Sequence, residues 1–342
     1  MKTLNETILD NISPFGDYLR NVRHPLKLLF LGEIKKPSGE SDYFKYIKQD
    51  IEDADLVFCQ YKYYDNDCDA FVKYLRENGV RYAFLADKHA YDNGLDTLKS
   101  TVNTLYNNDL WHSGVYRDDI DRQKHTPSIV RIRDFRIGLM SYTEELVDNK
   151  FEDSNVNIFI GPDGTLREKM LTENIKQLKD QDVDMIICNI CFKNEYTFAT
   201  TKRQKHIVDF LFKNGVAIVI GQGAHYVQKV EFNPQNDVYD NDTLVAYSLG
   251  NCLSNPHMDE YCDADGGIML HVDIDTGRKQ VDNASYKIVW CAKSIYESDD
   301  AYYTIPIKSQ NIIKKDSDKF GNFITNAHNQ ALNNNVNVSE EI

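Results

Sequence analysis

The chain has 342 residues, of which 42% are hydrophobic, and a formal net charge of -14. This size predicts a globular protein with a substantial core, and the acidic balance argues against a nucleic-acid partner, because phosphate binding relies on clustered Lys and Arg. No stretch is apolar for long enough to predict a secretion signal or a membrane span, so we expect a cytoplasmic protein.

The first part of the chain alternates strand-like and helical patterns. We expect a helical extension over residues 1–25, followed by short apolar runs that are typical of buried strands. These runs are Leu26–Gly32, Ala54–Gln60, Val80–Ala86, Phe135–Tyr142, Val183–Ile190 and Val216–Gly221. The helical patterns between them span Asp69–Asn78, Leu95–Tyr106, Leu166–Lys179 and Thr201–Asn214. The alternation predicts an α/β sheet.

After Tyr226 the pattern changes to strands without intervening helices. The runs VQKVEF, TLVAYSLG, GGIMLHVDI, YKIVWCA and YYTIPI predict largely antiparallel sheet. A layered α/β domain over residues 26–307, with two mixed β-sheets and helices outside, accounts for both halves. Residues 308–342 are polar and rich in Asn, which predicts a tail or a peripheral helix.

Polar side chains gather where these strands end, which is where α/β sheets bind ligands. In the stretch Ala217–Tyr226, AIVIGQGAHY, an apolar strand runs into a glycine-bracketed turn that ends in His225. The side chains at the strand ends are Glu33, Gln60, Lys62, Asp87, Lys88, His89, Asp92, Cys191, Glu195, Gln222, His225 and Asn251. Carboxylates, imidazoles and amide oxygens at one edge are the groups that hold two ions for phosphoester hydrolysis. A lone His after a strand is also commonly a structural residue.

Six blocks in this order resemble the CapA/PgsA capsule-synthesis family of poly-γ-glutamate biosynthesis, whose domain looks like a calcineurin-type metallophosphoesterase. The blocks are LFLGEI, ADLVFCQYK, LADKHAYDNG, ICFKNEY, GQGAHYVQKVE and YSLGNC. The family has a strand ending in GD, then ADLVFGNLE, LANNHALDYG, HWG-x-EY, GHHPHVLQPVE and YSLGNF. The resemblance covers about Leu26 to Ile307 and implies an α/β/β/α sandwich and a protein of capsule or exopolymer biosynthesis.

The departures from the family fall on positions that the resemblance implies as metal ligands. The replaced positions are Glu33 for Asp, Gln60 for Asn, Lys62 for Glu, Lys88 for Asn, Cys191 for His, and Gln222 with Gly223 for a His pair. The unchanged positions are His89, Glu195, His225 and Asn251. Like charges about 4 Å apart repel by roughly 4 kcal/mol at an effective dielectric of about 20. We hypothesise that the two-metal site is degenerate, with Lys62 and Lys88 in place of its positive charge. As an alternative, both lysines are surface residues paired with Asp65 or Asp87.

Three functions remain open at this point. In the first, a CapA-like protein binds an anionic polymer precursor or a phosphorylated small molecule, and capsule-pathway proteins are its partners. The substrate-binding residues are then Lys62, Lys88, Gln222, Glu195 and Asn251, although Asn251 also suits a turn cap. In the second, an active metal-dependent phosphoesterase or other hydrolase has a non-standard His/Cys/Glu metal site and uses His89 and His225 as catalytic residues. In the third, a pseudoenzyme binds an anion or a partner protein without catalysis.

The cofactor expectation divides in the same way, between no metal and one divalent ion of Mn, Zn or Fe. The ligands of a single ion would be Glu33, His89, Cys191 and His225. A related alternative places Cys59, Cys191 and Cys252 beside His89 and His225, because thiolate and imidazole together favour zinc or iron.

Overall fold

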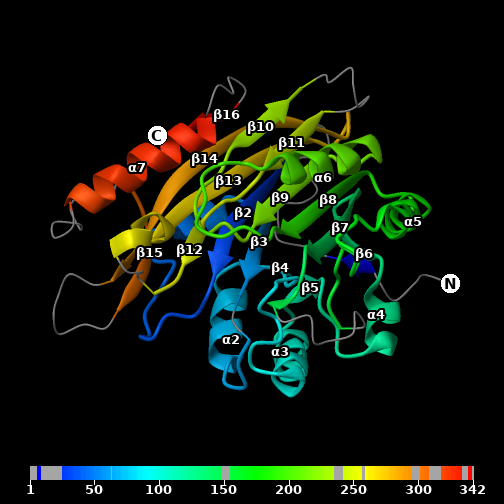
Figure 1. Cartoon of the computed structure of the whole chain (residues 1–342), viewed down its shortest axis with the longest axis horizontal. Coiled ribbons are helices and arrows are strands. Elements are labelled where there is room, and N and C mark those ends of the chain that lie inside the picture. The colour runs from blue at the N-terminus through cyan, green and yellow to red at the C-terminus, as the bar shows by residue number, and fades with distance from the viewer. Residues whose placement is uncertain are drawn as a thin grey trace, which may run out of the picture.

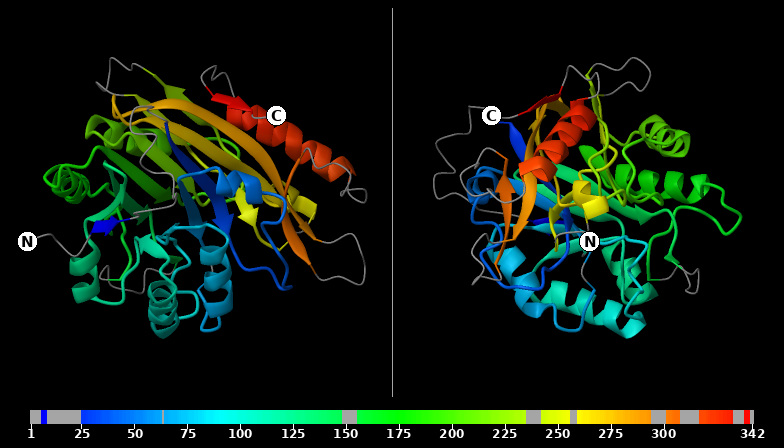
Figure 2. Two further views of the ribbon diagram at one scale, coloured as in Figure 1. Left: turned by 180° about the vertical axis from the view of Figure 1, so that it is seen from behind. Right: turned by 60° about the vertical axis from the view of Figure 1, so that its left-hand side comes forward.

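The computed structural model describes residues 6–8, 25–62, 64–147, 155–234, 242–255, 259–293, 301–307, 317–332 and 338–340. Two mixed β-sheets pack face to face, and helices cover their outer faces (Figures 1 and 2). This arrangement confirms the predicted layered α/β fold. Both predicted halves contribute to it, because each sheet contains strands from before and after Tyr226.

The first sheet joins a parallel half to an antiparallel half, in the order β15-β14-β13-β2-β3-β4-β5. Its parallel strands are β2 (Leu26–Ile34), β3 (Leu56–Tyr61), β4 (Tyr82–Phe84) and β5 (Trp111–Ser113). Its antiparallel strands are β13 (Gly266–Asp275), β14 (Gln280–Lys293) and β15 (Tyr302–Pro306). Two short strands extend it, β12 (Asn251–Leu253) beside β2 and β16 (Val338–Glu340) beside β14.

The second sheet has the order β1-β6-β7-β8-β9-β11-β10. Its centre is parallel and consists of β7 (Phe135–Thr143), β8 (Met185–Cys191), β9 (Ile218–Gln222) and β11 (Thr243–Ala246). Around this centre lie β10 (Val230–Asn233), antiparallel to β11, β6 (Ser128–Ile132), antiparallel to β7, and β1 (Glu6–Ile8), parallel to β6. The central strands are almost wholly buried, as expected for parallel strands covered on both faces.

Three apolar clusters hold the layers together. The largest lies between the sheets, where Phe30 and Phe58 stack with ring centroids 4.7 Å apart. A second lies between the first sheet and the helices α1 (Lys48–Glu52), α2 (Asp69–Glu77) and α3 (Leu95–Asn107). A third lies between the second sheet and the helices α5 (Glu168–Lys179) and α6 (Lys202–Lys213). The remaining helices are α4 (Asp119–His125), the 3-10 helix η2 (Asp259–Ala264) and α7 (Ser317–Leu332).

Both ends of the chain differ from the sequence expectations. The described part of the N-terminal segment, Glu6–Ile8, is a strand paired with β6, not a helix, and the rest of residues 1–24 lies outside the described residues. At the other end, α7 buries Phe323 and Ala327 in the core between the sheets. The segment predicted as a tail or a peripheral helix therefore does contain a helix, and because β16 also pairs with β14, part of the segment belongs to the domain. Its few apolar residues are spaced over a mostly polar helix, which made the pattern weak.

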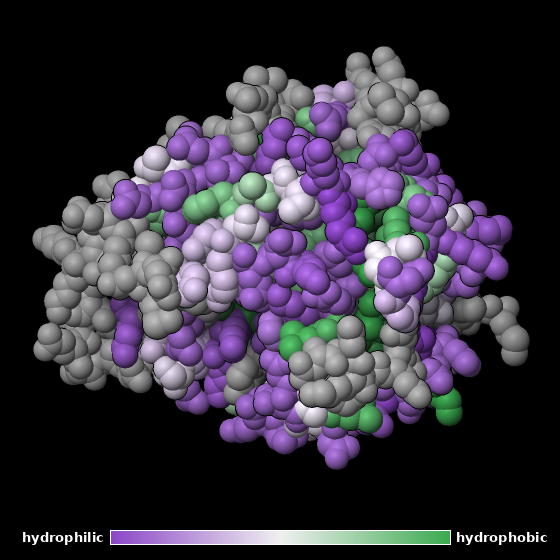
Figure 3. Space-filling model, viewed as in Figure 1, coloured by the Kyte–Doolittle hydropathy of each residue, from purple (hydrophilic) through white to green (hydrophobic). Residues whose placement is uncertain are grey.

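Hydrophilic residues cover most of the face in Figure 3. Across the described ranges, we find no helix that combines the length and the apolar character needed to cross a membrane.

Candidate functional site

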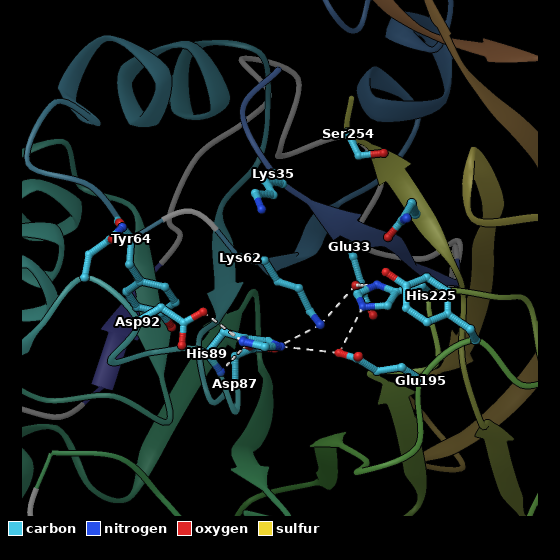
Figure 4. Close-up of a pocket in the computed structure, with 13 residues that line it drawn as sticks. Glu33, Lys35, Lys62, Tyr64, Asp87, His89, Asp92, Glu195, His225 and Ser254 are labelled. Atoms are coloured by element: carbon cyan, nitrogen blue, oxygen red, sulfur yellow. Dashed lines mark hydrogen bonds and ion pairs between the residues drawn. The ribbon is translucent and has the colours of Figure 1, made fainter. Parts of the chain in front are cut away.

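Parallel strands from both sheets end at one cavity of about 390 Å³ (Figure 4). Glu33 lies near the end of β2, Lys62 directly follows β3, and His225 lies in the turn after β9. Strand ends of this kind place side chains without disturbing the sheet, which explains why the polar residues collect here. The described residues that line the cavity are Glu33, Lys35, Lys62, Tyr64, Asp87, His89, Asp92, Asn93, Glu195, Tyr196, His225, Asn251 and Ser254.

The Lys62 ammonium group lies at the bottom of the site between two carboxylates. Its Nζ is 3.0 Å from Glu33 Oε2 and 2.9 Å from Asp87 Oδ2, and the side chain is only 9% exposed. Burial alone would lower the pKa of Lys62, but the charges of Asp87 and Glu33 outweigh it and hold the pKa well above its usual range. Lys62 is therefore a buried cation. The alternative prediction was right that it pairs with Asp87 but wrong that it lies on the surface.

His225 connects Glu33 to Glu195. Its Nδ1 lies 2.7 Å from Glu33 Oε2, and its Nε2 lies 3.4 Å from Glu195 Oε1. Burial alone would lower the pKa of His225, but the charge of Glu33 and the hydrogen bond with Glu195 raise it to about 9. Burial likewise opposes ionisation of Glu33, yet His225 and Lys62 lower its pKa far below the usual range. At neutral pH these groups form a network of opposite charges.

Glu195 gathers three basic side chains, Lys88, His89 and His225, around one oxygen. Lys88 Nζ lies 2.8 Å from Glu195 Oε1, and His89 Nε2 lies 3.3 Å from it. Lys88 also donates a hydrogen bond to the Lys193 carbonyl at 3.0 Å. Burial would raise the pKa of Glu195, but hydrogen bonds from His225, His89 and Lys88 lower it strongly. Lys88, which was predicted as a substrate-binding residue, therefore fixes Glu195 and does not line the cavity in this structure.

His89 is the most accessible imidazole of the site. Its Nδ1 lies 2.9 Å from Asp92 Oδ2, and its side chain is 41% exposed. The hydrogen bond with Glu195 raises the pKa of His89, and the charges of Asp87 and Asp92 add to this effect against partial burial. Carboxylates therefore face both ring nitrogens, Asp92 at Nδ1 and Glu195 at Nε2, so His89 could exchange a proton with a ligand only where that ligand takes the place of Glu195.

Gln60 and Gln222 do not reach the cavity. Gln60 donates to the Gly221 carbonyl at 3.0 Å, and so joins the two sheets. Gln222 donates to the Ala86 carbonyl at 3.2 Å and to Asn189 Oδ1 at 3.0 Å. Gln222 was predicted as a substrate-binding residue, but in this structure it does not line the cavity. Its amide satisfies buried backbone and side-chain acceptors instead.

The cysteines predicted near the site are buried in the core, and no cysteine is among the described residues that line the cavity. Cys191 Sγ donates to Asp87 Oδ2 at 3.4 Å, while Cys59 and Cys252 pack in the cluster beneath the first sheet. Burial raises the pKa of all three thiols well above the usual range. They are therefore neutral thiols in this structure.

Five lining residues were absent from the predicted set. They are Lys35, Tyr64, Asn93, Tyr196 and Ser254. Lys35 and Tyr196 each lie beside a predicted residue, since Lys35 follows the block LFLGEI and Tyr196 ends the block ICFKNEY. Asn251 lines the cavity as predicted, but its amide donates to the Ala264 carbonyl at 2.6 Å, which also supports the turn-cap interpretation.

Two residues at the cavity have a backbone conformation that side chains rarely adopt. The φ angles of Tyr196 and His225 are 49° and 59°, and the Tyr196 N–H donates to the Ala224 carbonyl at 2.8 Å. Such conformations cost roughly 1–3 kcal/mol each and persist where surrounding contacts impose them. Here Gly223 imposes the turn, with φ +99° and its N–H donating to Glu33 Oε1 at 2.8 Å.

Replacing Gly223 tests how tightly this turn is packed. A Cβ at this position would lie 2.3 Å from the Phe192 carbonyl oxygen, whereas at Gly164, with φ +78°, it would meet nothing within 4 Å. We expect Gly223→Ala to lower the free energy of unfolding by about 3 kcal/mol or more and Gly164→Ala by only about 1–2 kcal/mol. Chemical denaturation measures both, and equal losses would show that the close approach to Phe192 does not matter.

The family of the chain follows from comparison with known proteins. Residues 30–256 match the family described as bacterial capsule synthesis protein PGA_cap. The chain belongs to this family. The capsule biosynthesis protein CapA of Bacillus anthracis is 24% identical over 184 residues, which are 53% of this chain and 41% of that protein. The chain thus matches less than half the length of this relative. The family assignment agrees with the resemblance in the six sequence blocks.

These side chains do not fit the metals that the metallophosphoesterase-like fold of PGA_cap proteins implies. Lys62 Nζ lies within 3.0 Å of both Glu33 and Asp87, so it occupies the position where their oxygens would meet an ion. The Gly223 position has no room for the second His of the family pair, because of the Phe192 carbonyl. Among the residues that the structure describes, no three His, Cys, Asp or Glu side chains are grouped to hold a metal.

Proposed function

We propose that this protein acts in capsule or exopolymer biosynthesis with a degenerate two-metal site, in which Lys62 provides the positive charge. The polymer is poly-γ-glutamate or a capsular polysaccharide, and the site binds its anionic precursor. One observation carries the proposal, namely the buried Lys62 ammonium between Glu33 and Asp87. A buried lysine next to two carboxylates excludes a dication by charge and by volume.

The arrangement of charges supports binding of an anion at the rim. The four lining carboxylates are Glu33, Asp87, Asp92 and Glu195, and each has a Lys or His partner within 4 Å. They therefore present little uncompensated negative charge to a ligand. Lys35 adds an exposed cation at the cavity. A lysine binds phosphate or carboxylate as a point charge.

A genetic experiment tests the proposal. The gene is deleted in the organism that encodes it, and cell-surface polymer is quantified after complementation with wild type, Lys62→Glu or Lys73→Met. We expect the deletion to lower polymer, wild type and Lys73→Met to restore it, and Lys62→Glu to fail. Lys73 is the control because it forms an exposed helical pair with Glu77. Unchanged polymer in the deletion strain would contradict the proposal.

A second candidate, supported by the Asp92–His89 pair, is hydrolysis or transfer at a phosphoester or amide without a metal. His89 would exchange the proton as acid or base, while His225 and Glu33 orient the substrate. Hydrolysis of a generic phosphodiester that persists in chelator and disappears in His89→Gln would support this activity. Equal hydrolysis by wild type and His89→Gln would exclude His89 as the acid or base. No hydrolysis by wild type would favour a site that acts in binding alone, as in the pseudoenzyme hypothesis.

A further inference from the structure

Aromatic rings form a shelf beside the charged cavity, built from chain segments that follow β8 and β9 and from η2. Tyr196 contacts the His225 ring at 5.1 Å and the Tyr261 ring at 4.4 Å, measured between centroids. Tyr226 packs against Tyr196 at 5.8 Å and stacks on Phe198 at 4.7 Å. We call Tyr196, Phe198, Tyr226 and Tyr261 the aromatic shelf.

Tyr196 is the member of the shelf that reaches the cavity. It lines the cavity, and at 37% exposure it is one of three exposed large hydrophobic residues in the described ranges. Its φ of 49° places a bulky residue in the left-handed region, where Asn, Asp or Gly is usual. The neighbouring rings and the hydrogen bond to Ala224 hold it there. The fold thus maintains an unfavourable conformation that keeps one aromatic ring at the cavity.

Lys35 provides the complementary charge. Its backbone N–H donates to the Leu253 carbonyl at 2.8 Å, which anchors the residue between β2 and β12. Figure 4 shows its side chain apart from the carboxylates of Glu33, Asp87, Asp92 and Glu195, and no described carboxylate forms an ion pair with it. An exposed lysine that pairs with none of the described carboxylates can bind an anionic ligand.

We propose that the cavity binds an acidic saccharide, with a uronic-acid ring against Tyr196 and its carboxylate on Lys35. A pyranose has an apolar face of C–H groups that packs on an aromatic ring, and hydroxyl groups that suit the surrounding polar side chains. A poly-γ-glutamate chain has carboxylates but no such flat face. Lys35 would therefore bind it as well as it binds a uronate, whereas Tyr196 would favour the uronate. The cavity volume of about 390 Å³ lies within the range of small-molecule sites. This inference rests on the proposed function and names the polymer class.

Calorimetric titration of the full chain with three probes tests this inference. The probes are a trisaccharide of galacturonic acid, a neutral trisaccharide of galactose and a γ-linked glutamate oligomer of equal charge to the first. We expect the uronate to bind most tightly. Tyr196→Asn, which retains the left-handed backbone, should weaken it about tenfold, and Tyr196→Phe should leave it nearly unchanged. Lys35→Met should remove the preference for the uronate over the neutral sugar.

Other outcomes overturn the inference. Tighter binding of the glutamate oligomer, unaffected by Tyr196→Asn, would identify an acidic peptide as the ligand. Equal binding of the uronate and the neutral sugar would remove the role of Lys35, and no binding of any probe would refute a saccharide site. Circular dichroism of each variant controls for folding. These binding experiments are done in vitro and test only the saccharide site. The proposed function is tested separately, because an unchanged polymer level in the deletion strain would contradict it.

Discussion

Lys62→Met should lower the free energy of unfolding by about 3–5 kcal/mol, one of the two largest effects we expect. The substitution keeps the length of the aliphatic chain but leaves Glu33 and Asp87 buried without the cation between them. Glu33 retains His225, whereas Asp87 has no other cation within ion-pair distance among the described residues. The stability loss is measured by urea denaturation at pH 7.

Lys73→Met is the matched control for this prediction. Lys73 pairs with Glu77 on the surface of α2, with side chains that are 61% and 64% exposed. Exposed pairs contribute about 0–1 kcal/mol, so this variant should be close to wild type. Similar small losses in both variants would mean that Lys62 does not lie between the two carboxylates.

Alkaline pH should destabilise the protein through His225. The pKa of His225 is raised from 6.5 to about 9 in the folded protein. A raised pKa contributes stability that is complete below pH 6.5 and is lost as the pH rises through 9. The difference corresponds to roughly 3 kcal/mol, at about 1.4 kcal/mol per pH unit. Denaturation at a series of pH values from 6 to 10, taken at constant ionic strength, measures this loss.

The contribution of His225 is isolated by comparison with His225→Asn. Asn tolerates the positive φ of 59° and does not titrate, so this variant should lack the loss between pH 6.5 and pH 9. The difference between the two curves should therefore shrink as the pH rises. If the curves stay parallel from pH 6 to 10, His225 is not a cation held by Glu33 and Glu195.

Sequence reasoning located most strands and helices because their patterns are strong. Predicted Leu95–Tyr106 corresponds to α3, Leu95–Asn107, and predicted Phe135–Tyr142 corresponds to β7, Phe135–Thr143. It missed α4, which is short and polar and begins after the N-cap Asp118, and the strand β6, which lies between β1 and β7. Elements that bury little apolar surface leave weak periodic patterns, so their sequences resemble loops.

The site was predicted less completely, because strand-end positions do not reveal where side chains point. Glu33, Lys62, His89 and His225 reach the cavity, whereas Gln222 turns into the sheet toward Ala86. Tyr196 escaped prediction because nothing in a sequence marks a tyrosine with positive φ. Pairings between distant segments, such as Lys62 with Asp87 or Tyr196 with Tyr261, depend on the fold and are visible only in three dimensions.

The central claim is that Lys62 stands in the place of a metal. The metal content of the purified protein tests this claim most directly. Protein prepared without chelator is incubated with manganese, zinc or iron, passed through a desalting column and analysed by elemental mass spectrometry. We expect wild type to retain no stoichiometric metal, because the Lys62 ammonium group holds Glu33 and Asp87. Two ions per chain in wild type would contradict the claim and would identify the protein as a metal-dependent member of its family.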